Sequence, residues 1–100
     1  MDDIYLQIKE LVIGLLVPAR TEKRIDAHVF EEFHKILIDL EQELKGKEYI
    51  PRKIAGQLFF IYTSLAAEAE HCNYDDDLFL AVGEIADMLD RIFWESPFKN

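Results

Sequence analysis

Apolar residues return every three or four positions in four stretches of this chain, which is the spacing of one face of an α-helix. Pro18, Gly46, Pro51 and the polar cluster 73–77 separate these stretches. No stretch alternates between apolar and polar residues as a half-buried strand would. The sequence therefore predicts an all-α fold, an antiparallel four-helix bundle with short connections. The four predicted helices run from about Asp3 to Val17, from Asp26 to Lys45, from Pro51 to His71, and from Asn73 or Asp75 to a point before Pro97.

Each predicted helix carries a stripe of large apolar side chains, and we expect these stripes to meet in one core. Asp26 fits the N-cap position of the second helix. In the third helix we expect the small residues Gly56, Ser64, Ala66 and Ala67 to let a neighbouring helix come close. The expected core residues are Ile4, Ile8, Leu11, Leu15, Phe30, Phe33, Leu37, Leu40, Leu44, Ile54, Leu58, Ile61, Leu65, Leu78, Val82, Ile85, Leu89 and Ile92.

Length and composition restrict the class of protein. One hundred residues allow one domain with one core, so we take residues 1–100 as a single helical domain. The formal net charge of −9 argues against a nucleic-acid partner, since phosphates would repel the chain. Cys72 is the only cysteine, so the chain can form no internal disulfide, and this favours a reducing compartment.

We expect a cytoplasmic protein with no membrane span. The apolar run Leu11–Val17 is far shorter than the ~20 residues that a membrane-spanning helix needs. The acidic residues Asp2 and Asp3 do not fit the basic first region of a secretory signal.

The last third of the chain holds most of its negative charge. Residues 68–100 contain nine acidic and two basic residues, a balance of −7 out of −9. At ~100° per residue, several acidic and two large apolar side chains of the fourth helix point away from its core stripe. Such a face is typical of a surface that binds a basic protein partner, with the aromatic residue as anchor. The predicted partner-binding residues are Asp76, Leu80, Glu84, Asp87, Asp90 and Trp94. The alternative is a solvated acidic face, with Trp94 folded under the tail 96–100.

Two Glu-x-x-His pairs, Glu31–His34 and Glu68–His71, have the spacing that carboxylate-bridged di-iron bundles use. Such a centre also needs an inward glutamate from each of the other two helices, and the sequence offers none in the right register. We therefore expect no metal, no cofactor and no catalytic residue, and interpret the two pairs as solvated helix surface. A small metal-binding protein or enzyme that uses these four residues is the alternative.

From about Phe33 to Phe93 the chain resembles the small helical bacteriocin immunity proteins of the pediocin-like (enterocin A immunity) family. Three segments carry the resemblance: LIDLEQELKGK, the proline-opened IPRKIAGQLFFIYTSLAAEA and DDDLFLAVGEIADMLDRIF. It implies a cytoplasmic four-helix antiparallel bundle that protects its producer from a toxin. The chain departs from that family in being acidic rather than basic and in its short tail. It is also similar to the acidic helical immunity proteins of bacterial nuclease toxins, including contact-dependent inhibition systems, which bind cationic toxins.

Together these features predict an immunity or antitoxin-type protein that is not an enzyme. It would bind and neutralise a cognate bacterial toxin or bacteriocin through the acidic face of its fourth helix, as a monomer or weak dimer. A structural homodimer that buries Leu80 and Trp94 is a third possibility.

Overall fold

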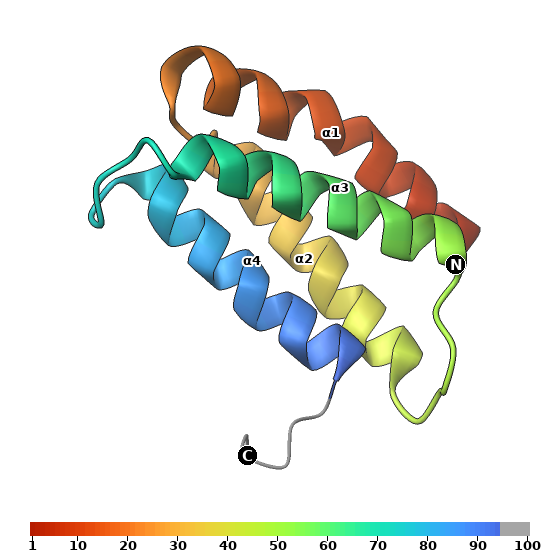
Figure 1. Cartoon of the computed structure of the whole chain (residues 1–100). Helices are drawn as coiled ribbons and strands as arrows, with labels where there is room; N and C mark the ends of the chain where they lie inside the picture. The colour runs from red at the N-terminus through yellow and green to blue at the C-terminus, as the bar shows by residue number, and fades with distance from the viewer. Residues whose placement is uncertain (95–100) are drawn as a thin grey trace.

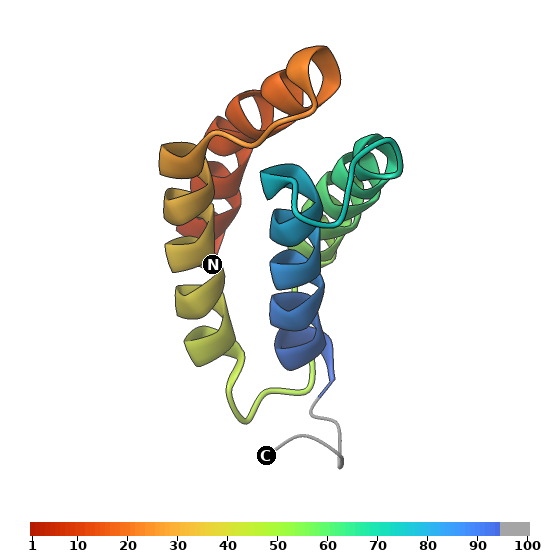
Figure 2. The ribbon, with the colours of Figure 1, turned by 90° about the vertical axis from the view of Figure 1, so that its left-hand side faces the viewer.

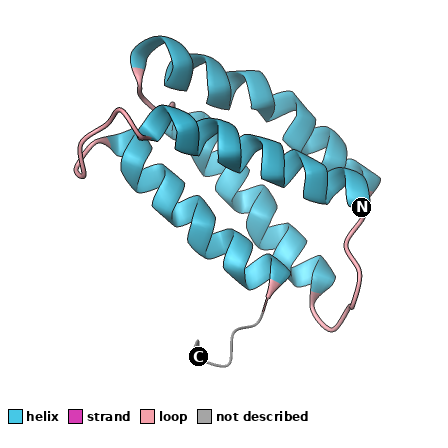
Figure 3. Cartoon of the chain, in the orientation of Figure 1, coloured by secondary structure: helices cyan, strands magenta, loops and turns pink. Residues whose placement is uncertain are grey.

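The computed structural model describes residues 1–94, in which four α-helices and no strand are found (Figure 1, Figure 3). Successive helices reverse direction, which confirms the predicted all-α antiparallel four-helix bundle. The helices are α1 (Asp2–Glu22), α2 (Ala27–Leu44), α3 (Arg52–Ala69) and α4 (Asp77–Phe93).

The order of the helices around the bundle differs from their order along the chain. Helix α1 packs against α2 and α3, and α4 packs against the same two helices. Helices α2 and α3 are therefore diagonal partners, and the connection between them crosses one end of the bundle (Figure 2). Helices α1 and α3 run parallel, whereas α3 and α4 form an antiparallel pair on one side (Figure 1, Figure 2).

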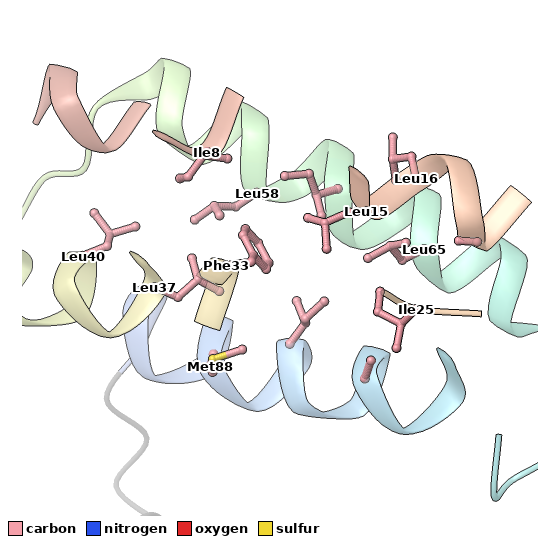
Figure 4. Packing of buried hydrophobic residues seen from close by; sticks show 14 of the residues in the cluster. Ile8, Leu15, Leu16, Ile25, Phe33, Leu37, Leu40, Leu58, Leu65 and Met88 are labelled. Carbon is pink, nitrogen blue, oxygen red and sulfur yellow. The ribbon is translucent and has the colours of Figure 1, made fainter. Parts of the chain in front are cut away.

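The core lies between all four helices and is entirely apolar among the described residues. Phe33 from α2 sits near its middle, with Leu37 from the same helix and with Ile8 and Leu58 from α1 and α3 (Figure 4). All four core residues predicted for α3 are buried, as are four of the five predicted for α2. The fifth, Phe30, is partly buried at the edge.

Helix α1 extends beyond the predicted break at Pro18, so that boundary was wrong. Proline lacks an N–H and disfavours the helical conformation in the residue before it. Here the turn that follows buries Ala19 completely, and that packing outweighs the local preference. The helix ends instead at Lys23, whose left-handed φ of 54° lets the amide of Arg24 donate to the carbonyl of Pro18.

The inward face of α4 is rotated from the prediction. Ala81 and Met88 are buried, whereas the predicted core residues Val82, Leu89 and Ile92 are only partly buried. Large apolar residues cover more than half of the circumference of α4, so periodicity alone leaves its rotation open. Contact with both α2 and α3 selects the final orientation.

Local signals placed other features correctly, with one exception. The side chain of Asp26 caps α2 by accepting from the amides of His28 (3.0 Å) and Val29 (3.1 Å). Gly46 has a φ of 77° just after α2. Gly56, however, does not mediate a close helix approach, because a Cβ there would meet nothing within 4 Å. The close approach occurs at Gly14, where a Cβ would lie 3.2 Å from methyl carbons of Val29.

Candidate partner-binding surface

The outer side of α4 presents acidic and large apolar side chains together. We call the residues predicted to bind a partner (Asp76, Leu80, Glu84, Asp87, Asp90 and Trp94) the acidic face. The side chains of Leu80 and Trp94 are 53% and 60% exposed, and Asp87 is exposed with them. The buried stripe of α4 lies on the opposite side of the helix. Leu80 therefore projects outward from α4, as expected. Trp94 is exposed too, but it follows the end of α4 at Phe93 in an extended conformation, so its place beside the acidic residues stays a prediction.

Little positive charge from α4 itself offsets this face. Arg91 is the only basic residue of α4. Its guanidinium turns toward α2, where Nε lies 3.3 Å from Oε1 of Glu41. Helix α4 therefore contributes more negative than positive charge, a balance that favours the approach of cationic partners.

Asp76 differs from the other members of the acidic face. It occupies the N-cap position of α4 and is partly buried. Its Oδ2 accepts a hydrogen bond from the amide of Asn73 at 2.9 Å, which closes the turn that leads into α4. Asp76 thus has a structural role in addition to its charge.

A groove between α3 and α4 was missed by the sequence analysis. It consists of two open hollows of about 370 and 220 Å³ that share Tyr62 as a lining residue. The aromatic side chains of Phe59 and Phe93 remain 71% and 49% exposed at its rim. We call it the α3/α4 groove; its lining residues are Ala55, Phe59, Tyr62, Ala66, Ala69, Glu70, Phe79, Val82, Gly83, Ala86, Leu89 and Phe93.

One sequence signal could have revealed this groove. The apolar arc of α4 is wider than a single core-facing stripe requires, and its surplus residues Phe79, Leu89 and Phe93 lie on the side next to α3. Val82 and Leu89 were predicted as core residues because their helical spacing also fits a core-facing stripe. Only the rotation of α4 in the bundle shows whether these residues face the core or line the groove.

The two Glu-x-x-His pairs lie on the diagonal helices α2 and α3 and their flanks. Glu31 pairs with Lys35 at 3.4 Å, and Glu68 accepts a hydrogen bond from Lys23 of α1. Within residues 1–94, no group of three or more histidine, cysteine, aspartate or glutamate residues is placed to hold a metal ion. The expected absence of metal remains a prediction.

Cys72 packs at the end of α3, where its thiol is partly buried. Burial, reinforced by the negative charge of Asp76, raises the pKa of the thiol above its ordinary value. A raised pKa keeps the sulfur protonated at neutral pH, which is the opposite of what a nucleophilic cysteine needs.

No protein family, curated protein or solved structure matches this chain. In the described part of the chain, no helix is both long enough and apolar enough to cross a membrane.

Proposed function

We propose that this chain is an immunity or antitoxin-type protein that neutralises a basic protein toxin in the cytoplasm by binding it. The observation that carries the proposal is the exposure of Leu80 on the side of α4 that carries Asp87, with Trp94 exposed directly after the end of the helix. Large aromatic residues at the centre of an interface contribute much of its binding energy. Surrounding charges of one sign accelerate encounter with a partner of the opposite sign.

The mechanism requires no chemistry from the chain. The acidic face would dock on the basic substrate cleft of the toxin, and Leu80 and Trp94 would lose their water against it. The cleft would then be closed to its substrate. A nuclease toxin fits this mechanism well, because the cleft that binds nucleic acid is lined by positive charge.

The partner to test first is any toxin with a basic C-terminal domain encoded beside this gene. Asp87→Lys should slow association with the purified toxin domain and weaken the salt dependence of binding, as changes in rim charge do. Trp94→Ala should speed dissociation and weaken binding by about 2 kcal/mol or more. Asp39→Lys, the same charge change on the exposed side of α2, is the matched control and should have a smaller effect on association. Surface plasmon resonance at two salt concentrations measures all three.

Stability measured on the same samples decides between two roles for Trp94. Neither Asp87 nor Trp94 is buried, so at physiological salt, where charge repulsion is largely screened, neither variant should unfold at a lower midpoint than the wild type. A Trp94→Ala protein that is destabilised and still binds normally would contradict the proposal. That outcome is expected if residues 96–100 cover Trp94, an alternative from the sequence that lies outside the described residues.

A further inference from the structure

The α3/α4 groove has the spacing of a seam that receives another helix. Along α4 its lining residues Phe79, Val82, Ala86, Leu89 and Phe93 follow each other at intervals of three and four. At 1.5 Å per residue these positions span about 21 Å, or close to four helical turns. On α3 the lining residues Ala55, Phe59, Tyr62, Ala66 and Ala69 repeat the same intervals.

Both walls contain small as well as aromatic side chains, so the groove is hollowed rather than filled. The small residues Ala66, Gly83 and Ala86 line one hollow, and the exposed side chains of Phe59 and Phe93 border the other. Apart from Glu70 and the Tyr62 hydroxyl, hydrocarbon and backbone line the groove. An amphipathic helix lays its apolar face into such a groove with anchors at i, i+3 or i+4, and i+7.

The charges around the groove specify the other face of the occupant. Helix α3 carries no charged residue between Lys53 and Glu68, so its rim is neutral over most of the groove. On α4, the exposed Asp87 follows the lining residue Gly83 by about one turn, and Glu70 lines one end of the groove. A second copy of this chain would bring the same acidic residues and another net charge of −9, which disfavours it as the occupant.

We infer that the α3/α4 groove binds an amphipathic helix of a partner protein. Its apolar face would lie against Phe59, Tyr62 and Leu89, and its basic residues would lie along the α4 side. The inference builds on the proposed function, because the basic partner proposed there would supply this helix. The inference adds to that proposal that the recognised segment of the partner is a helix. It also adds the α3/α4 groove as a second contact surface beside the acidic face.

A designed peptide tests the groove without knowledge of the natural partner. The probe has about 18 residues, enough to span the groove at 1.5 Å per residue, and consists of leucine and lysine with the leucines on one helical face. The control peptide has the same composition in strict alternation, so that it has the same charge but no apolar helical face. Amide chemical shifts of the labelled protein map the contact, and the fluorescence of the single tryptophan, Trp94, gives the affinity.

Two glycine variants separate the groove from the general attraction of charge. Gly83 lines the groove and Gly56 does not, and a Cβ at either position would meet nothing within 4 Å. Glutamine favours a helix more than glycine does, so Gly83→Gln and Gly56→Gln should both fold. We expect Gly83→Gln to weaken binding of the amphipathic peptide about tenfold, as loss of a well-packed contact does, and Gly56→Gln to change it less than about twofold.

The result expected is preferential binding of the amphipathic peptide, with shift changes that concentrate on the groove. Equal binding of both peptides, unaffected by Gly83→Gln but weakened by Asp87→Lys, would overturn the groove and leave the basic-partner proposal standing. No binding of either peptide would overturn the groove, and the toxin experiment would decide the proposed function separately. A dimer in sedimentation equilibrium that Gly83→Gln dissociates would instead identify a second copy as the occupant and overturn the inference.

Discussion

Leucine residues at similar positions in the apolar patterns of α3 and α4 have different surroundings. Leu58 is 1% exposed and lies close to Ile8 and Phe33 in the middle of the core (Figure 4). Leu89 is partly buried and lines the open α3/α4 groove beside Phe93. The sequence predicted both as core residues, because hydropathy and spacing report which residues are apolar but not how a helix is rotated.

Truncation of these two leucines should therefore have unequal effects. Leu58→Ala leaves an enclosed cavity and should lower the free energy of unfolding by about 2–5 kcal/mol. Leu89→Ala removes buried surface next to an open hollow and leaves no enclosed cavity. Its loss in free energy of unfolding should therefore come from the lost burial of hydrocarbon alone and stay below about 2 kcal/mol. Urea denaturation of both variants measures the difference. Equal losses at the two sites would mean that the groove is closed in solution.

At the scale of whole helices, the bounds and the buried face were predicted best where a helix has one narrow apolar stripe and clear capping residues at its ends. Helix α2 satisfies both conditions, with a narrow stripe between the N-cap Asp26 and Gly46. The predicted end of α1 was wrong, because the burial of Ala19 outweighed the tendency of Pro18 to end the helix. The predicted rotation of α4 was also wrong, because its broad apolar arc fits more than one orientation. Both failures arise from contacts between distant segments, which no local rule contains.

The same limit applies to the candidate surfaces. The acidic face was predicted from the periodicity and charge of one helix and its flanks, and its role in binding stays a prediction. The α3/α4 groove depends on which helix lies beside α4, and α2 and α3 both do so. The sequence alone does not indicate which residues of α3 lie beside which residues of α4.

One contact between helices depends on a charge and makes a prediction about acid stability. Glu68, in the last turn of α3, accepts a hydrogen bond from Lys23, which follows the end of α1. That hydrogen bond, with the charges of Lys23 and Arg20, lowers the pKa of Glu68 below its ordinary value of 4.5. The folded state thus favours the ionised carboxylate. Its contribution to stability is present above pH 4.5 and is lost as the pH falls through the lower pKa of the folded protein.

Glu68→Gln should therefore lower the unfolding midpoint at pH 7, and the difference from wild type should shrink as the pH falls below 4.5. Urea unfolding at several pH values measures this difference. A double-mutant cycle with Lys23→Gln is the control, since loss of the donor should remove most of the effect of Glu68→Gln. A difference that persists unchanged at the lowest pH would show that the carboxylate charge is not the cause.

At the scale of the whole molecule, the net charge of −9 both favours binding and opposes folding. Apart from the partly buried Lys23–Glu68 contact, the ion pairs of the described residues, such as Lys53–Asp2 at 2.9 Å, are largely exposed and contribute little to stability. Repulsion among the remaining acids is felt over long distances at low ionic strength, where the Debye length is about 30 Å at 0.01 M. The proposed function gives this unfavourable charge a reason, since the acids that repel one another also attract a cationic partner.

Salt should consequently stabilise the free protein while it weakens binding to a basic partner. We expect the thermal unfolding midpoint to rise between about 0.01 M and 0.15 M sodium chloride, as the Debye length falls from about 30 to 8 Å.

Glu84→Gln combined with Asp87→Asn should raise the midpoint at low salt, reduce its dependence on salt, and slow association with the partner. Lys9→Gln combined with Lys47→Gln changes the net charge by the same amount in the opposite direction, at exposed positions outside α4, and should lower the midpoint. If salt lowers the midpoint instead, local ion pairs outweigh the repulsion from the net charge. If Glu84→Gln with Asp87→Asn gives no gain in stability at low salt, these two acids do not oppose folding. The negative charge of α4 would then need another explanation.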